Sequence, residues 1–312
     1  MDALAVVMEG PERLTLSRLP IAPPTEDDAV VAMEWSGVSA GTERLLWRGR
    51  MPKFPGMGYP LVPGYESVGL VVEAGSRSGL RTGDRVFVPG AKCFGAVRGL
   101  FGGAASRVTA PGARLTVIEA DVGEDAVMLA LAATARHALA DPKGRPPQLI
   151  VGHGALGRLL ARISLALGDT PVVWETNPTR LDGAEGYEVL HPDADPRRAY
   201  DSIYDASGDA GLLDTLIARL AFGGEITLAG FYSEPVAFAF PPAFMREARL
   251  RVAAEWKPED MAAVVALVAD GRLSLSGLIT HRASALDAGD AYRTAFDDPA
   301  CLKMILDWRR CS

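Results

Sequence analysis

Cysteine is scarce in this chain of 312 residues, and its scarcity excludes one kind of site. The three cysteines, Cys93, Cys301 and Cys311, form no Cys-x-x-Cys pair. A structural zinc site with four cysteine ligands is therefore excluded. So few cysteines are also typical of a reducing compartment, which predicts a cytoplasmic location.

Long apolar runs and an excess of positive charge are missing as well. No stretch reaches about 18 consecutive apolar residues, so no membrane span is expected. The N-terminus lacks a basic segment followed by an apolar run, so we expect no signal peptide. The net charge of -7 argues against nucleic-acid binding, because such proteins need a basic face to neutralise phosphates.

Two different patterns divide the chain. In residues 1–115, glycine and proline interrupt short apolar runs at 3–8, 29–35, 68–73 and 85–88, which predicts an irregular antiparallel β domain or a partly open β-barrel. From about residue 121 strands alternate with helices, which predicts a doubly wound parallel sheet of the Rossmann type. The expected strands are 148–151, 171–175, 202–206, 225–229 and 303–308, and the expected helices are 125–140, 156–167, 212–220, 258–270 and 287–296.

We predict that the tail returns to the first domain. The first domain would then comprise residues 1–117 and 256–312, and the parallel-sheet domain would be an insertion at 118–255. Helix 125–140 would join the two. The fold class expected from this pattern is α/β.

A glycine motif marks the expected nucleotide site. Gly152, Gly154 and Gly157 form Gly-x-Gly-x-x-Gly between a predicted strand and a predicted helix. The first glycine permits the tight turn, the second lets the backbone approach a pyrophosphate, and the third lets the helix pack on the strand. Glu175 ends the next strand, where a carboxylate binds ribose hydroxyls and repels a 2′-phosphate. NAD is therefore predicted rather than NADP, with the nearby Arg180 as the one contrary feature.

Four further residues are predicted to contact this cofactor. His153 lies inside the motif, and its ring is expected to face cofactor or solvent. Leu156 belongs to the same motif, Ser207 follows strand 202–206, and Thr134 on the joining helix is expected to face the nicotinamide. The other histidines, His137, His191 and His281, are expected to be structural.

Several segments together resemble the medium-chain dehydrogenase/reductase superfamily: Gly37-Val38-Ser39, Gly64-Tyr65-Glu66, Gly83-Asp84-Arg85-Val86, Gly152–Gly157 and Tyr204-Asp205-Ala206-Ser207-Gly208. The resemblance implies a GroES-like catalytic domain and a Rossmann NAD-binding domain. Zinc enzymes of this superfamily carry Cys and His where this chain has Ser39 and Tyr65, and they have a further zinc ligand near the position of Ala130. Serine, tyrosine and alanine are poor substitutes as zinc ligands, so no catalytic metal is predicted.

A narrower resemblance covers residues 39–47, 50–52 and 54–66. These segments are similar to the 3-hydroxyethyl bacteriochlorophyllide a dehydrogenases of bacteriochlorophyll synthesis, a family within that superfamily. The resemblance implies a tetrapyrrole substrate whose 1-hydroxyethyl group at C3 is oxidised to acetyl, with NAD as the hydride acceptor.

Oxidation of an alcohol requires a group that takes up the hydroxyl proton, at about 2.6–3.2 Å from it. Tyr65 is the first candidate, as a phenol donor or relay, and Thr42 is the second. Glu66 would polarise Tyr65 or act as the base itself, and Ser39 would hydrogen-bond the substrate oxygen. The alternative is that Tyr65, Glu66 and Ser39 are packing residues.

The same loop offers material for binding a large pigment. A macrocycle needs a wide apolar cleft, and a propionate suits a guanidinium. The apolar and aromatic candidates are Trp47, Met51, Phe54, Met57 and Tyr59, and the basic ones are Arg44, Arg48, Arg50 and Lys53. A solvated basic loop is the alternative reading.

Two other functions compete with this one. A zinc-independent quinone or enoyl reductase of the same superfamily would usually prefer NADPH, against which Glu175 argues. A non-catalytic NAD(P)-binding scaffold would have no need of the loop at 39–66.

We also predict peripheral contact with other pigment-synthesis enzymes. A homodimer paired through an edge strand at 231–240 is predicted as well, unless those residues belong to the core.

Overall fold

The computed structural model describes residues 1–141 and 143–311. They divide into two compact units, Met1–Ala130 with Ser276–Ser312, and Leu131–Leu275. The sequence predicted 1–117 with 256–312, and 118–255. The structure therefore places the return to the first unit at Ser276, so that the predicted helix at 258–270 belongs to the second unit.

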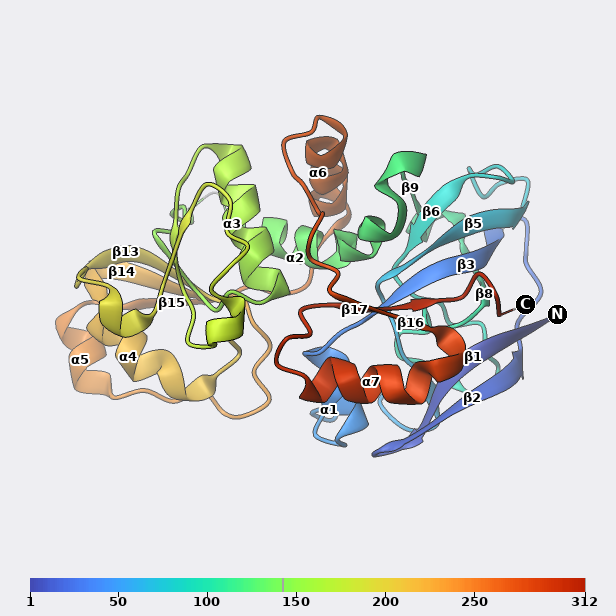
Figure 1. The fold of residues 1–312 in the computed structure, drawn as a ribbon, viewed down its shortest axis with the longest axis horizontal. Helices are drawn as coiled ribbons and strands as arrows, with labels where there is room; N and C mark the ends of the chain where they lie inside the picture. The colour runs from blue at the N-terminus through green and yellow to red at the C-terminus, as the bar shows by residue number, and fades with distance from the viewer. Residues whose placement is uncertain (142, 312) are drawn as a thin grey trace. The chain divides into compact units, whose positions relative to one another are not determined.

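The first unit is built from two sheets (Figure 1). The smaller sheet has the strand order β2-β1-β4-β7, from β1 (Asp2–Gly10), β2 (Arg13–Pro20), β4 (Leu61–Val62) and β7 (Arg98–Gly99). The larger sheet has the strand order β16-β17-β3-β5-β6-β9, and β8 pairs with β3 outside this order. Its strands are β3 (Asp28–Val38), β5 (Ser67–Ala74), β6 (Arg85–Val88), β8 (Arg107–Pro111), β9 (Thr116–Val117), β16 (His281–Ser284) and β17 (Met304–Asp307). In the described residues these sheets do not close, so the predicted barrel is an open one.

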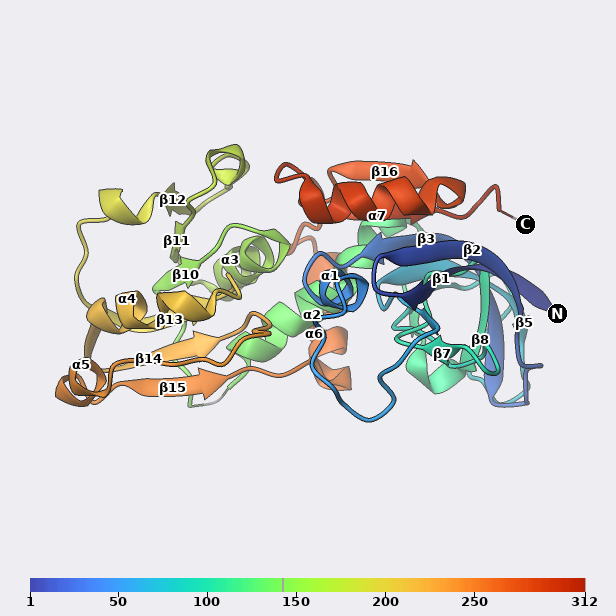
Figure 2. The ribbon, with the colours of Figure 1, turned by 90° about the horizontal axis from the view of Figure 1, so that it is seen from below.

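The C-terminal segment completes the larger sheet of this unit. Strand β17 pairs antiparallel with β3, and β16 pairs with β17. Helix α7 (Ala288–Asp297) lies against both β16 and β17, as the two views show (Figures 1 and 2). The last residues of the chain therefore share a core with the first ones, in a cluster that includes Met8, Val31, Tyr292 and Trp308.

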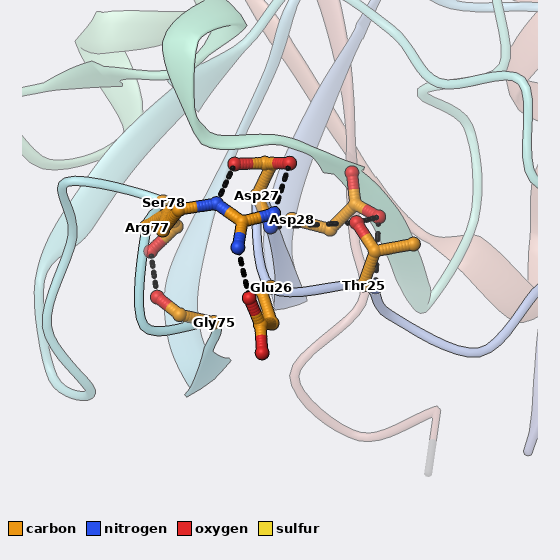
Figure 3. Close-up of polar contacts among 7 residues, drawn as sticks. All are labelled: Thr25, Glu26, Asp27, Asp28, Gly75, Arg77 and Ser78. Carbon is orange, nitrogen blue, oxygen red and sulfur yellow. Dashed lines mark hydrogen bonds and ion pairs between the residues drawn. The ribbon is translucent and has the colours of Figure 1, made fainter.

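The turn that leads into β3 is held to the turn after β5 (Figure 3). Arg77 donates to both oxygens of Asp27 at 2.9 and 3.0 Å, and also pairs with Glu26. The backbone N–H of Gly75 donates to Asp28 O at 2.8 Å. Because these ion pairs are exposed, we expect them to contribute little to stability.

The second unit contains a six-stranded parallel sheet in the order β12-β11-β10-β13-β14-β15. Its strands are β10 (Leu149–Val151), β11 (Val172–Trp174), β12 (Glu188–Leu190), β13 (Tyr200–Asp205), β14 (Leu220–Leu228) and β15 (Arg249–Val252). This is the strand order of a doubly wound dinucleotide-binding fold, with the switch point between β10 and β13. The predicted α/β class and Rossmann sheet are confirmed.

The predicted helices are present near their expected positions, and α1 and α5 are two short helices that the sequence did not predict. Helix α3 (Ala155–Leu167) ends at Gly168, whose φ of 98° is the left-handed conformation that favours glycine. The others are α1 (Thr42–Trp47), α2 (Leu129–Leu139), α4 (Leu213–Ala218), α5 (Phe240–Met245) and α6 (Pro258–Ala269). Residues 120–128, which the sequence assigned partly to the joining helix, form 3₁₀ turns before α2.

The predicted edge strand at 231–240 is wrong. Residues 231–239 form no strand, and the edge strands of the parallel sheet are β12 and β15. Pro235 limits ladder formation in this segment, because proline has no N–H to donate. No helix in the described residues is both long enough and apolar enough to cross a membrane.

Candidate functional site

The glycine motif forms a close-packed turn at the carboxyl end of β10. Gly152 has a φ of 96°, and a Cβ atom on it would lie 3.3 Å from the backbone of Ser207. A Cβ on Gly157 would lie 1.8 Å from Gly152 O, so only glycine fits there. At Gly154 the space is open, since among the described residues outside its own chain segment only Arg180 Nη1, at 3.8 Å, comes within 4 Å of where a Cβ would lie. This cradle at the N-terminus of α3 fits the diphosphate of a dinucleotide.

Glu175 lies directly beside that turn. Its side chain is 8% exposed, and its Oε2 accepts from the backbone N–H of His153 at 2.8 Å. Its Oε1 accepts from the backbone N–H groups of Thr176 and Asn177, each at 2.8 Å. A carboxylate has about four lone-pair sites, so these three bonds orient it and leave capacity for a ribose hydroxyl. The ribose contact itself stays a prediction.

The expectation for the ring of His153 is wrong. The ring is fully buried, with Nδ1 2.6 Å from Arg180 O and Nε2 2.8 Å from the Tyr187 hydroxyl. A carbonyl can only accept, so Nδ1 carries the proton and Tyr187 donates to Nε2. Burial lowers the pKa of His153 to about 4, which keeps the ring neutral. The ring therefore faces neither solvent nor the open side of the motif.

The remaining predicted cofactor contacts are untested. Ser207 is exposed at the end of β13, where its N–H and its hydroxyl donate to Asp205 Oδ1 at 2.9 and 2.6 Å. Leu156 is half-buried in the first turn of α3, and Thr134 is half-buried on α2. Their contact with a cofactor remains a prediction.

In the first unit, the predicted catalytic residues come together around Tyr65. Ser39 follows β3, and its Oγ lies 2.8 Å from the Tyr65 hydroxyl. The side chain of Thr42, at the start of α1, lies close enough to lower the pKa of Tyr65 slightly. Burial, and then the charge of Glu66, raises the pKa of Tyr65 above its usual value of 10.0. The phenol is therefore held in its protonated form, as a donor or relay rather than a phenolate base.

Glu66 is tied to a residue that the sequence did not point to. It is fully buried, and Lys303, itself 3% exposed, donates from Nζ to Glu66 Oε2 at 2.5 Å. Glu66 Oε1 has no hydrogen-bond partner among the described residues. This burial favours the polarising role of Glu66 over direct contact with a substrate.

A second buried carboxyl lies in the same cluster. Glu43 on α1 is fully buried, and Tyr292 on α7 donates to its Oε2 at 2.8 Å. Desolvation, followed by smaller effects that include the charge of Glu66, raises the pKa of Glu43 to about 8. Near neutral pH, Glu43 is therefore largely in its protonated form. Neither Glu43 nor Tyr292 nor Lys303 carried a sequence signal, because the partners are more than 200 residues apart.

Glu43→Gln is expected to change how stability depends on pH. A raised folded-state pKa means that the folded chain holds a proton which the unfolded chain, with a pKa of 4.5, releases. Stability is then greatest below pH 4.5 and falls as the pH rises to about 8, by on the order of 4 kcal/mol for this group. The variant should lack this part of the decline, which urea unfolding at pH 5, 6.5 and 8 would measure. Parallel stability–pH curves for both proteins would contradict the assignment.

The side chains at the expected zinc position do not fit that metal. Ser39 and Tyr65 bond each other, Glu66 Oε2 is occupied by Lys303, and Ala130 offers no side-chain donor. Over residues 1–141 and 143–311, no group of three or more His, Cys, Asp and Glu side chains is placed to hold a metal ion. Zinc requires several nitrogen, sulfur or oxygen donors at about 2.0–2.3 Å.

The predicted pigment-binding loop is only partly open to solvent. Met51 is buried in the core, which corrects its assignment to a cleft. Trp47, Met57 and Tyr59 pack against that core while staying partly accessible, and Phe54 is exposed.

The basic residues of this loop lie at the surface. Arg44, Arg48, Arg50 and Lys53 are all exposed. Arg48 is paired with Asp297 at 3.1 Å, so its guanidinium already has a carboxylate partner within the unit.

Comparison with known proteins agrees with both units. The alcohol dehydrogenase GroES-like domain family matches residues 25–120. Among solved structures, an alcohol dehydrogenase of Escherichia coli complexed with NADH superposes with a TM-score of 0.82, at 20% identity over 98% of this chain and 99% of that one. A putative zinc-binding dehydrogenase of Sinorhizobium meliloti bound to NADP gives a TM-score of 0.79, at 21% identity with the same coverage. These likenesses show the fold.

Two curated proteins show the family. The 2-desacetyl-2-hydroxyethyl bacteriochlorophyllide A dehydrogenases of Rhodobacter capsulatus and Cereibacter sphaeroides are each 58% identical to this chain, over 99% of both sequences. The resemblance read from residues 39–66 is thereby confirmed. The chain is an oxidoreductase that belongs to the 2-desacetyl-2-hydroxyethyl bacteriochlorophyllide A dehydrogenase family, within the medium-chain dehydrogenase/reductase superfamily.

Proposed function

We propose that this protein oxidises the C3 1-hydroxyethyl group of a bacteriochlorophyllide to an acetyl group, with NAD as the hydride acceptor and without catalytic zinc. The observation that carries the substrate is the 58% identity to two dehydrogenases whose name specifies a hydroxyethyl bacteriochlorophyllide. Because both matches extend over 99% of the sequences, they include both units.

The choice of NAD rests on Glu175. Its carboxylate is fixed at the end of β11 by three backbone donors, where its charge opposes a 2′-phosphate. When bound, NAD supplies the acceptor for the hydride that leaves the carbinol carbon. Calorimetric titration with NADH and NADPH tests the choice, and tighter binding of NADPH would overturn it.

The absence of zinc rests on the donor set of Ser39, Tyr65 and Ala130. In place of a metal, the Tyr65 hydroxyl would hydrogen-bond the substrate oxygen. As the substrate hydroxyl loses its proton to Tyr65, Tyr65 passes its own proton to the hydroxyl of Ser39 or Thr42, which in turn releases its own proton to solvent water. The protein purified without chelators should contain far less than one zinc per chain by elemental analysis, and added zinc should not raise its activity.

The decisive experiment is a direct assay. The protein is incubated with NAD and a hydroxyethyl bacteriochlorophyllide, and the long-wavelength absorption band of the pigment is followed together with NADH formation. Both signals should change in equal molar amounts. A quinone or enoyl reductase would leave the pigment unchanged, and a scaffold protein would bind cofactor without turnover.

The substrate carboxylate would be bound by the exposed basic residues of the loop. A propionate suits the planar fork of a guanidinium, and Arg44 and Arg50 are exposed there. Charge reversal at each position in turn should raise KM for the pigment while leaving KM for NAD unchanged. Equal KM values in all variants would leave the loop as a solvated basic surface.

We also propose a homodimer that forms through β15. This strand is one of the two edge strands of the parallel sheet, and its Val252 and Leu250 are 75% and 41% exposed. The neighbouring apolar side chains Phe240, Phe244 and Met245 are exposed as well. An unpaired apolar edge favours pairing with another chain. Sedimentation analysis should show a dimer that Val252→Lys weakens.

A further inference from the structure

A buried arginine holds the loop after β11 against the glycine motif. Arg158 lies in the second turn of α3 and is 7% exposed. Its Nε donates to His153 O at 3.1 Å, inside the motif. Its two terminal nitrogens donate to three carbonyls of the loop: Arg180 O at 3.2 Å, Asp182 O at 2.7 Å and Gly183 O at 3.2 Å. One guanidinium therefore joins the motif to residues 180–183.

His153 makes a second tie between the same segments. Its Nδ1–H donates to Arg180 O, which also accepts from Arg158, and its Nε2 accepts from the Tyr187 hydroxyl. The ring of Tyr187 meets the imidazole edge to face, with centroids 5.6 Å apart. The carbonyl of Arg180 is thus fixed by two donors from the motif and the helix that follows it.

These ties fix the backbone from which the Arg180 side chain extends. Its Nη1 is 3.8 Å from the position that a Cβ on Gly154 would occupy, and it is the one atom found within 4 Å of that position. Gly154 is the glycine at which the backbone leaves room for a diphosphate. On the other side of the motif, the N–H of His153 donates to Glu175. His153 is therefore hydrogen-bonded both to Arg180 and to Glu175, the two residues that lie on either side of the open cradle at Gly154.

Burying the guanidinium of Arg158 costs desolvation free energy, which indicates that its hydrogen bonds have a structural role. An ion removed from water costs several kcal/mol unless its donors are satisfied, and here the four hydrogen bonds described all end on backbone carbonyls. Arginine is the side chain whose planar fork can reach several such carbonyls at once. Its effect is to fix the backbone of a loop rather than to neutralise a carboxylate.

We propose that Arg158 and His153 are positioning residues of the dinucleotide site, which hold Arg180 and Glu175 at the open side of Gly154 and so set the affinity for the diphosphate-bearing cofactor. Neither residue takes part in hydride transfer. This inference rests on the proposed function in one respect, namely that the cradle binds a nicotinamide dinucleotide.

The test compares Arg158→Met with Arg162→Met. Both variants remove one positive charge from α3, and Arg162, which is half-buried, donates to Ser274 O at 2.9 Å. The dissociation constant for NADH, measured by fluorescence titration, should rise roughly tenfold or more for Arg158→Met and less than twofold for Arg162→Met. At saturating NAD, kcat should stay within about twofold of the parent value in both, and Arg158→Lys should give intermediate affinity.

A second variant covers the case in which Arg158→Met does not fold. Tyr187→Phe removes only the hydroxyl that donates to His153 Nε2, and it should raise the same dissociation constant about threefold or more with kcat unchanged. Folded variants at Arg158 and Tyr187 that bind NADH as tightly as the parent protein would overturn the proposal and leave the proposed function intact. If the parent protein binds NADPH and not NADH, the NAD assignment fails. The dissociation constants of the parent protein and the variants are then compared for NADPH.

Discussion

Replacing Lys303 with methionine is expected to lower the free energy of unfolding by about 3–5 kcal/mol. The reason is that Glu66 is fully buried and Lys303 supplies its one charged partner by hydrogen bonding. Without the ammonium, the carboxylate must be left unpaired in a low-dielectric environment or take up a proton. Glu66 Oε1 already lacks a partner among the described residues, so no second donor is in place to compensate. Urea unfolding at pH 7 measures the loss.

The double variant Glu66→Gln with Lys303→Met is the control. Removing both charges eliminates the unpaired ion, so most of the lost stability should return. A double-mutant cycle then gives the coupling energy between the two side chains. A single Lys303→Met variant that loses less than about 1 kcal/mol would mean that the pair is not buried as described.

Tyr65→Phe is expected to lower kcat by about 10²- to 10⁴-fold, the usual range for loss of a positioned proton donor. The substitution removes only the hydroxyl that bonds Ser39 Oγ at 2.8 Å, and it keeps the ring that packs edge to face on Phe101. KM for the pigment should therefore change little, which separates a chemical role from a binding role. Steady-state kinetics of pigment oxidation measure both constants.

Two further variants define the specificity of that effect. Tyr204→Phe removes another buried tyrosine hydroxyl, which donates to Arg145 O in the second unit, and it should leave kcat unchanged. Thr42→Ala should lower kcat by a smaller factor than Tyr65→Phe, because Ser39 remains as a second acceptor for the Tyr65 proton. Near-normal turnover in both Tyr65→Phe and Thr42→Ala would exclude the relay.

The local sequence pattern predicted most secondary-structure elements because their cues lie within the elements themselves. Strand β6 and helices α3 and α6 fall within a residue or two of their expected bounds. In each, the apolar period and the flanking glycine or proline act over a few residues. The expected edge strand at 231–240 failed because alternating apolar residues also occur in an irregular segment when a partner strand is lacking.

In the candidate sites, too, the sequence predicted the features that depend on local spacing and missed those that depend on distant partners. Gly152, Gly154, Gly157 and Glu175 could be identified because a dinucleotide site uses residues at fixed spacing around one strand-turn-helix unit. The ring of His153 could not be oriented, since its partners Tyr187 and Arg180 lie in a loop beyond the next strand. The periodicity of apolar residues in a sequence does not indicate the direction of a side chain in a turn.

The sequence by itself determined an irregular β unit and a parallel-sheet unit with a dinucleotide motif, because residue type and local spacing suffice for each. The resemblance to the superfamily then placed Ser39 and Tyr65, rather than cysteine and histidine, at the usual metal position. The tertiary structure alone decided that Tyr65 is kept as a protonated phenol, and that Glu66 and Glu43 are buried with Lys303 and Tyr292. The physical reason is that pairing and desolvation depend on which distant segments share a core. Here β17 and α7 bring the end of the chain to the loops around β3 and β5.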